Sequence, residues 1–298
     1  MNLTEKFAPL ANKLSIGQYC PPKCFELAGK SFKFILDRGE DTGDFMLDFV
    51  DETTVSFNGP NGKRSGEAKY ECRKADDWTY LVTFCLYDPR ENYTFVIDKE
   101  QSLVTYLRCT KGENPYYPYL IDSHWSFGYI YVEGEEHTDY KRHDFTDDVA
   151  GTGIKWVYGH ELATVHIYYN TKWYRITYPG AAAKSKEQLE MNANLNGAVN
   201  ALPGSDEPAF YVKIKEGMYL VSVTEQNMEK NLGAKMGFRS DTLCFLDNWN
   251  RMYSVGRGYG TATAEGKEDG EIFVMIGKYG VPQEIDEHFF TDPNPYLV

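Results

Sequence analysis

The sequence predicts an all-β protein made of two tandem antiparallel domains, and three observations support this prediction. A strand-like segment occurs twice, as Tyr80-Leu-Val-Thr-Phe-Cys-Leu86 and Tyr219-Leu-Val-Ser-Val-Thr-Glu225, and the copies start 139 residues apart (219 − 80). Both copies alternate in the way expected of a strand with one buried face. The chain of 298 residues exceeds the usual single core, which suggests two domains. Short strand-like segments separated by turn residues recur on both sides of its middle.

The first half contains alternating apolar segments bounded by Gly, Pro and Asn turns. Strands at this spacing are typical of a meander, a sandwich or a barrel. After an irregular lead-in over residues 1–28, we expect strands at Ser31–Leu36, Asp44–Phe49, Thr53–Phe57, Glu67–Arg73, Tyr80–Tyr87, Asn92–Asp98 and Ser102–Cys109.

The two halves join between residues 111 and 148, where an aromatic strand is expected at Phe127–Val132. We expect the boundary near Tyr140–Ala150, which gives domains of residues 1–140 and 141–298. The second half follows the same order of elements, with a helix expected at Lys184–Val199 and a turn at Gly256–Gly260. Its expected strands are Ile154–Tyr158, Thr164–Tyr169, Lys172–Tyr178, Ala209–Ile214, Met218–Glu225, Lys235–Phe238, Asp241–Asp247 and Met252–Gly256.

Composition and charge limit the classes of partner. The net charge is −13, from 31 basic and 44 acidic residues, and no basic stripe is present, so neither a nucleic acid nor an anionic membrane is expected as a partner. The first residues lack an apolar signal core and no run of 18 apolar residues occurs, so we expect a cytoplasmic protein. A homodimer is one assembly that such a surface allows.

Cysteine and histidine patterns do not predict a metal site. Of six cysteines only Cys20 and Cys24 are close in sequence, and no second pair completes a tetrahedral set, so reduced thiols are expected. His124, His137 and His143 lie in or near the polar linker and are expected to be solvated. Phosphate-binding and nucleophile-elbow motifs are absent from the sequence, and no cofactor is expected.

Glu225 is the most distinctive ionisable residue. It has the same strand parity as Tyr219, Val221 and Val223, whereas Leu86 stands at its place in the first copy. A carboxylate on an apolar face costs free energy unless it is paired, neutralised or used. Burial favours the neutral carboxyl, which could donate a proton, although a buried glutamate is more often a hydrogen-bonded structural carboxyl than a catalyst.

Strand parity groups several aromatic side chains with Glu225 if the second domain is a barrel. Trp156 and Tyr158 share one face of their strand, His166 and Tyr168 share a face of the next, and Tyr174 lies on the third. Closed eight-stranded barrels enclose one small ligand, and these side chains would form an aromatic cup around it. Each of them is also an ordinary packing residue of such a barrel.

Two segments of the chain resemble the MoaF family. Arg142-His-Asp-Phe-Thr-Asp-Asp-Val-Ala-Gly151 resembles the junction and second-domain opening of these proteins, and His166-Ile-Tyr-Tyr-Asn170 is similar to their His-Ile-Tyr-Leu-Asn strand. The resemblance covers most of residues 29–260 and implies two lipocalin-like barrels in one chain. The family takes its name from a genetic association with molybdenum cofactor metabolism.

The second half also resembles the phenolic acid decarboxylases, which are single lipocalin-like barrels that work without a cofactor. Tyr174-Arg-Ile176 with Gly180 matches their Tyr-Arg-Ile-His-Ser-Gly segment. The segment Lys215-Glu-Gly-Met-Tyr-Leu-Val-Ser-Val-Thr-Glu225 is similar to their Glu-Gly-Val-Tyr-Lys-Val-Ser-Trp-Thr-Glu, which ends in the catalytic glutamate. The resemblance therefore implies that Glu225 is catalytic.

This sequence departs from the decarboxylase pattern at two places. Two tyrosines of that family hold the substrate carboxylate, and Trp156 and Tyr158 stand at their positions, so one phenol is lost. The essential arginine of the family follows the glycine, where this chain has Ala181-Ala-Ala-Lys184 and an insertion. Lys184 is the nearby candidate, and these departures put the family's own substrate in doubt.

The sequence thus predicts a cofactor-independent lyase or isomerase that acts on a small aromatic or conjugated ligand inside the second barrel. Glu225 would donate or accept the proton and Tyr158 would orient or polarise the ligand. A non-catalytic small-molecule carrier or sensor, and an accessory protein of molybdenum cofactor metabolism, are the alternative hypotheses. The side chains expected to bind the substrate are Trp156, His166, Tyr168, Tyr174, Lys184 and Val223.

The first barrel is expected to be structural. Leu36 and Leu86 stand where the second half has Tyr158 and Glu225, so an acid–phenol pair is not expected in its interior. Apolar side chains support folding but provide no proton donor.

Overall fold

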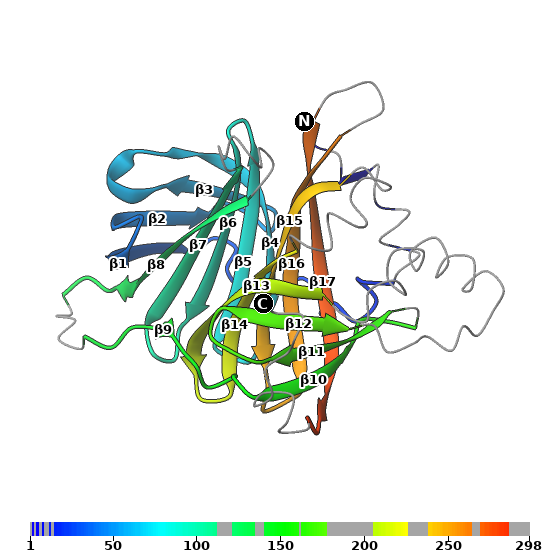
Figure 1. Cartoon of the computed structure of the whole chain (residues 1–298). Helices are drawn as coiled ribbons and strands as arrows, with labels where there is room; N and C mark the ends of the chain where they lie inside the picture. Colours follow the sequence, from blue (N-terminus) through cyan, green and yellow to red (C-terminus); the bar gives the residue numbers. More distant parts are fainter. Residues whose placement is uncertain are drawn as a thin grey trace.

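Two rings of antiparallel strands form the protein (Figure 1). The computed structural model describes residues 2, 4–5, 8, 12, 15–111, 121–134, 140–160, 162–177, 205–225, 238–263 and 269–285. In the first ring each strand pairs with the next, and the last strand returns to the first, which closes the barrel. Its strands are β1 (Ser31–Gly39), β2 (Gly43–Phe49), β3 (Thr54–Asn58), β4 (Ser65–Lys74), β5 (Thr79–Tyr87), β6 (Arg90–Asp98), β7 (Leu103–Lys111) and β8 (Ile121–Tyr131), with the 3-10 turn η1 (Pro60–Gly62) after β3.

The second ring has the same meander order and is closed by pairings at two places. The final strand of the chain pairs with the first strand of this ring, and the third strand pairs with the fourth. A short strand from the linker, β9 (Asp144–Phe145), adds to the fourth strand from outside the ring. The ring strands are β10 (Thr152–Val157), β11 (Ala163–Tyr168), β12 (Trp173–Thr177), β13 (Ser205–Lys215), β14 (Met218–Thr224), β15 (Phe238–Asn248), β16 (Tyr253–Thr263) and β17 (Asp269–Gln283).

The prediction of two tandem barrels is confirmed. Strand spacing alone allowed a meander, a sandwich or a barrel, and both halves are meanders closed into barrels. Two details of the prediction are wrong. Residues 256–260, expected to form a turn, lie within β16, and the whole of β17 was not expected. The expected helix at residues 184–199 and most of the expected strand at 235–238 lie outside the described residues.

Strand register confirms the internal duplication. Tyr80 lies in β5 and Tyr219 in β14, and each of these is the fifth strand of its ring. The next hairpin also corresponds, because each copy carries one non-glycine residue with a positive φ just before its second strand, Ser102 at 55° and Met252 at 46°. The same turn geometry in the same place is what a duplicated domain would produce.

Aromatic rings fill the interior of the first barrel. Phe84 stacks on Tyr93 with ring centroids 5.0 Å apart, and Phe95 stacks on Tyr106 at 4.9 Å. Phe45 meets Phe95 edge to face at 5.0 Å. Alternating strand residues supply these rings, since inward and outward positions alternate along every strand of a barrel.

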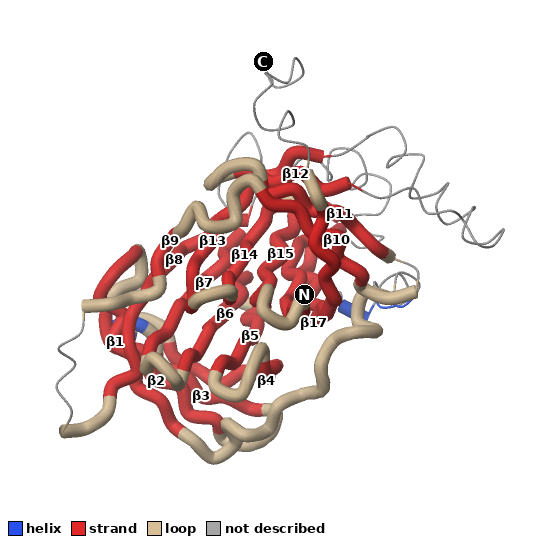
Figure 2. Tube along the Cα trace, turned by 90° about the horizontal axis from the view of Figure 1, so that it is seen from below, coloured by secondary structure: helices blue, strands red, loops and turns tan. Residues whose placement is uncertain are grey.

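The outer faces of the two barrels pack on each other through a second apolar core. In Figures 1 and 2 the strands β5–β7 lie alongside β13–β15. Burial of outward-facing apolar side chains at this junction joins the barrels into one folded unit. The buried members of this junction core are Ala75, Leu81, Val96, Leu107, Cys109, Ile121, Trp125, Phe127, Val212, Ile214, Met218, Leu220, Cys244, Leu246, Val255 and Tyr259.

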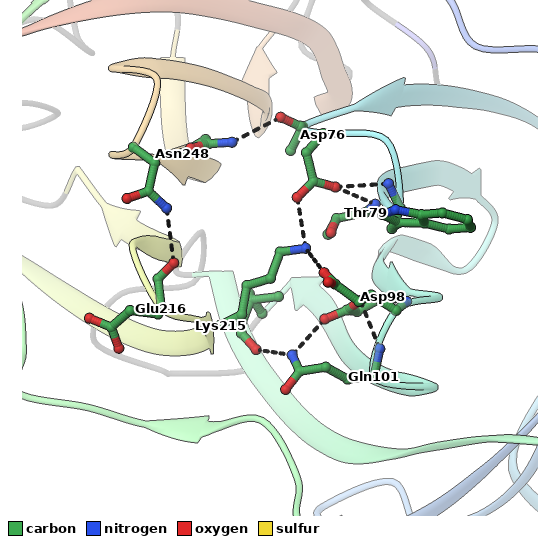
Figure 3. A network of polar contacts seen from close by, with 12 residues as sticks. Asp76, Thr79, Asp98, Gln101, Lys215, Glu216 and Asn248 are labelled. Carbon is green, nitrogen blue, oxygen red and sulfur yellow. Dashed lines mark hydrogen bonds and ion pairs between the residues drawn. The ribbon is translucent and has the colours of Figure 1, made fainter.

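Polar contacts cross the same junction. The ammonium of Lys215 on β13 lies 2.7 Å from Asp76 Oδ2 and 2.8 Å from Glu100 Oε2, both in the first barrel (Figure 3). Gln101 Nε2 donates to the carbonyl of Ile214 at 2.9 Å. These contacts fix the relative position of the two barrels at the ends of the strands, where the apolar core stops.

The chain before β1 contacts the second barrel as well as the first. The backbone N–H of Gly277 on β17 donates to the carbonyl of Ile16, and the N–H of His160 donates to Gln18 Oε1 at 2.9 Å. Further along, the N–H of Cys24 donates to the carbonyl of Cys72 at 2.9 Å. Across the described part of the chain, no helix has the length and apolar character needed to cross a membrane.

Candidate functional site

Five of the side chains predicted to face the second barrel's interior do so. Trp156, Tyr158, His166, Tyr168 and Tyr174 are all buried, and the four aromatics share one core cluster. Trp156 Nε1 donates to Tyr168 Oη at 3.0 Å, and His166 lies between the Tyr158 and Tyr168 hydroxyls at 3.5 and 3.4 Å. The His166 ring meets the Tyr174 ring edge to face at 5.1 Å between centroids. The inward orientation predicted from strand parity is therefore confirmed for these five side chains, which are called the aromatic cup from here on.

Strand pairing explains why these side chains meet. On β10 and β11, Ile154 pairs with His166 and Trp156 pairs with Thr164. On β11 and β12, Tyr168 pairs with Tyr174. Residues that pair directly across antiparallel strands project from the same face, so one alternating register places the whole set inside.

Glu225 follows β14 and is 6% exposed, in line with Val221 and Val223, which are buried in the same core as the aromatic cup. Burial is the main cause that raises the pKa of Tyr158, and the nearby Glu225 raises it further, so carboxyl and phenol act on each other within one interior. Lys184, the predicted substitute for a decarboxylase arginine, lies outside the described residues. The catalytic and binding roles of these residues stay predictions.

A buried amine–carboxyl pair lies in the same interior and was missed by the sequence reasoning. Lys278 on β17 and Asp247 on β15 are both fully buried, and Lys278 Nζ lies 3.5 Å from Asp247 Oδ1. The same Nζ lies 3.5 Å from the ring centroid of Phe245, 4.2 Å from that of Trp156 and 5.9 Å from that of Tyr158. The pair is therefore part of the aromatic cup.

Burial shifts both members of this pair toward their uncharged forms. It lowers the pKa of Lys278 to about 8, against the opposing influence of Asp247. Burial likewise raises the pKa of Asp247, although Lys278, Ser254 and Trp249 hold it down. Desolvation outweighs mutual attraction because a fully buried charge loses more hydration than one contact at 3.5 Å returns.

The neighbouring imidazole and phenols are uncharged near neutral pH. Burial, helped by the positive charge of Lys278, lowers the pKa of His166 well below its usual value. Burial raises the pKa values of Tyr158 and Tyr168 above the ordinary phenol range. The interior thus offers a neutral imidazole and neutral phenols that can donate or accept hydrogen bonds around one titratable amine.

A sequence signal for Lys278 exists. It follows Ile272, Val274 and Ile276 at alternate positions, which is the pattern that singled out Glu225 on β14. This alternation predicts an inward Lys278 only if residues 269–283 are recognised as a strand, and no strand was predicted there.

The duplication shows that the amine–carboxyl pair belongs to the second barrel alone. Register relates positions of the two rings at a constant offset of 150 residues along the last strands. At the positions of Asp247, Ser254 and Lys278 the first barrel has Ile97, Val104 and Gly128. The first barrel closes without any ionisable group there.

The expectation that the first barrel has no acid–phenol pair is wrong. Leu36 is buried and Leu86 is half-buried, as their apolar character suggests. Elsewhere in the same barrel, however, Tyr93 Oη donates to Glu91 Oε2 at 2.6 Å. The prediction compared only the positions equivalent to Tyr158 and Glu225. Glu91 and Tyr93 lie on β6, which that comparison did not include.

Arginines neutralise the carboxyl of this pair. Arg108 Nη1 donates to Glu91 Oε1 at 3.3 Å, and Arg64 Nη2 lies 3.2 Å from the same oxygen. Arg108 also contacts both carboxylate oxygens of Asp41, at 2.6 and 3.1 Å. Two acids and two arginines thus satisfy one another, which fits the structural role expected for this barrel.

Of the histidines expected in a solvated loop, His143 is buried, and His124 is a partly exposed strand residue. His143 is 1% exposed, with Nδ1 2.8 Å from Thr105 Oγ1 and Nε2 3.8 Å from Asp98 Oδ2, at the junction of the barrels. His124 lies in β8 and its Nδ1 is 2.8 Å from Glu40 Oε2. His137 lies outside the described residues. Tertiary contacts brought these segments against the first barrel, which a polar composition does not reveal.

Of the two family resemblances predicted from the sequence, comparison with known proteins supports the one to the MoaF family. Residues 7–110 match the family model described as MoaF N-terminal domain. No curated protein matches the chain. A solved structure described as a putative beta-lactamase from Burkholderia vietnamiensis is 19% identical, covering 38% of this chain and 96% of its own, with a TM-score of 0.28 that supports no inference here.

The family match falls on the first barrel and its lead-in. The resemblance of the second half to the phenolic acid decarboxylases therefore stays a prediction. Within residues 7–110 lie β1 to β6 and nearly all of β7, that is, most of one complete ring. The predicted resemblance to the MoaF family is thereby supported over residues 7–110, which are similar to its N-terminal domain, whereas the segments at 142–151 and 166–170 lie outside the match.

Proposed function

We propose that the second barrel is a cofactor-independent lyase or isomerase that transfers a proton to or from a small aromatic or conjugated ligand. The observation that carries the proposal is the placement of a buried carboxyl, Glu225, in the same interior as the Tyr158 phenol and an aromatic cup. A ring-lined interior with a few convergent polar groups is the usual setting of a small-molecule site.

Each group has a role that its surroundings support. The buried side chain of Glu225 would give a proton to a conjugated carbon and later recover it. Tyr158 keeps its proton because burial raises its pKa, and its hydroxyl can stabilise negative charge that develops on a ligand oxygen. The rings of Trp156, Tyr168 and Tyr174 would stack against a planar ligand.

The replacement Glu225→Gln tests the proposal, because an amide keeps the shape and the hydrogen bonding of the side chain but cannot transfer the proton. With 4-hydroxycinnamate as probe, we expect wild-type turnover, followed by ultraviolet absorbance, to fall by about two to four orders of magnitude in the variant. Quenching of tryptophan fluorescence by the probe should be retained. Glu216→Gln, on the exposed β13–β14 hairpin, is the matched control and should behave as wild type.

The carrier or sensor hypothesis predicts a different result from the same measurements. The aromatic cup alone is sufficient for binding, so a carrier would bind the probe with and without Glu225 and show no turnover in either protein. Wild-type binding without turnover, across a panel of conjugated carboxylic acids and enones, would replace the enzyme proposal by the carrier.

A further inference from the structure

We propose that the amine of Lys278 is a nucleophile that condenses with the carbonyl group of a small conjugated aldehyde or ketone inside the second barrel, with Asp247 carrying the proton. This inference shares with the proposed function only the entry of a small ligand into the barrel, and it does not depend on Glu225.

The geometry of Lys278 differs from that of an ordinary buried ion pair. Asp247 Oδ1, at 3.5 Å from Nζ, lies beyond the usual charge-assisted hydrogen-bond length of about 2.7–2.9 Å. Within the described residues, Nζ has no closer hydrogen-bonding oxygen or nitrogen partner, although the residue is fully buried. Its other neighbours are ring faces, of Phe245 at 3.5 Å and Trp156 at 4.2 Å. The amine is thus held by packing and keeps its bonding capacity.

Barrel architecture does not explain the pair. The first barrel has Ile97 and Gly128 at the corresponding positions and closes with the same topology. Burying two charges usually costs more than their attraction returns, and apolar replacements are often neutral or stabilising. The buried Asp247–Lys278 pair costs folding free energy, and the first barrel closes without it. Its presence among the rings of the second barrel therefore indicates a chemical role for the amine.

The electrostatic surroundings favour the reactive form of the amine. The titratable groups that face or influence Lys278 are Asp247 on β15, His166 on β11 and Tyr158 at the end of β10. The last two are uncharged near neutral pH, so Asp247 is the one group of the three that can stabilise the ammonium. With a pKa of about 8, about one Lys278 side chain in ten is uncharged at pH 7. Lysines buried in apolar sites serve as Schiff-base nucleophiles for this reason.

The condensation balances without an oxidant or a reductant. The Nζ lone pair of Lys278 attacks the carbonyl carbon, the C–N bond forms as the C=O π bond breaks, and one proton moves from the nitrogen to the carbonyl oxygen to give a carbinolamine. Asp247 in its carboxylic acid form gives a proton to the hydroxyl, which leaves as water as the C=N bond forms. Asp247 thereby becomes a carboxylate beside the protonated imine, so charge separation is compensated at 3.5 Å.

Reductive trapping with cinnamaldehyde tests the proposal on the unmodified protein. The chain is equilibrated with the aldehyde, treated briefly with borohydride, and analysed by intact mass and peptide mapping. We expect one dominant adduct on Lys278 that forms at least about tenfold faster than the adduct on Lys155, a partly exposed lysine of neighbouring β10. The initial rate should rise with pH toward about 8, as Lys278 loses its proton.

Variants separate the amine from its surroundings. Lys278→Met should lose the dominant adduct, Lys155→Met should keep it, and Asp247→Asn should slow its formation about tenfold or more. Glu225→Gln should be labelled as wild type, so failure of the proposed proton transfer can be told from failure of this inference. Circular dichroism of each variant checks that it has folded.

Two results would overturn the inference. The first is wild-type protein in which surface lysines are trapped and Lys278 is not, which would show an inert buried pair. The second comes from cinnamate, which has the same ring and no aldehyde. If cinnamate binding requires Lys278 while cinnamaldehyde gives no Lys278 adduct, the amine binds anions and is not a nucleophile.

Discussion

At the residue scale, the buried pair Asp247 and Lys278 should lower the free energy of unfolding, and this effect can be measured. Removing one partner leaves the other buried without compensation, so Asp247→Leu should lower the free energy of unfolding by about 3–5 kcal/mol. The double replacement Asp247→Leu with Lys278→Met removes both charges and should be neutral or stabilising by about 1–4 kcal/mol. Urea unfolding at pH 7 measures both. A double variant as unstable as the single one would contradict this account.

The same pair predicts a pH dependence whose sign follows from Lys278. Its pKa falls from 10.5 in the unfolded chain to about 8 in the folded protein, so between these values the unfolded chain binds more protons. Stability contributed by this group therefore rises with pH between about 8 and 10.5, and is lost as pH falls through that range. The difference in unfolding free energy between the wild type and the double variant should change with this sign, measured at pH 7.5 and 10.

At the scale of one element, β16 shows why a strand carries glycine at an inward position. A Cβ on Gly256 would lie 2.4 Å from the carbonyl oxygen of Cys244 and 2.5 Å from Phe245 Cδ1. The backbone oxygen cannot move without disturbing the β15–β16 pairing, and Phe245 supports Lys278. The glycine therefore makes room for the ring on which the amine packs.

Gly256→Ala should destabilise the protein by about 1–3 kcal/mol, the usual cost of overpacking a core. Gly258→Ala is the matched control on the same strand, because its Cβ would meet only side-chain ends, at 3.1 Å from Val274 and 3.2 Å from Leu243. We expect the control to cost clearly less in thermal unfolding. Equal losses for both variants would show that chain entropy, and not the close approach, requires these glycines.

At the scale of the whole molecule, the junction core predicts that the two barrels unfold together. Outward side chains of both barrels form one buried cluster, so neither barrel keeps its outer face covered when the other unfolds. Calorimetry should show one transition with equal calorimetric and van't Hoff enthalpies. Leu81→Ala at the junction should shift this entire transition downward, by about 2–5 kcal/mol, whereas Val50→Ala at an exposed position should not. Two separable transitions would contradict the prediction.

The face on which each strand residue projects could be predicted from the local sequence alone. A period of two assigned Glu225 to the same side as Tyr219 and put His166 with Tyr168, and the repeated segment indicated two similar domains. These predictions depend on backbone geometry that is local, so each strand could be read without its neighbours. The contacts of the lead-in with the second barrel escaped this reasoning because they join segments that lie far apart in the chain.

Which of the inward side chains contact one another depends on the arrangement of the strands in space. Asp247 and Lys278 lie on strands separated by β16, and closure of the ring brings their side chains to 3.5 Å. His143 belongs to a polar segment, yet contacts with Asp98 and Thr105 bury it at the junction. Alternation fixes the side on which a residue projects, whereas its neighbours there depend on register, ring closure and domain packing, which are set by contacts between distant parts of the chain.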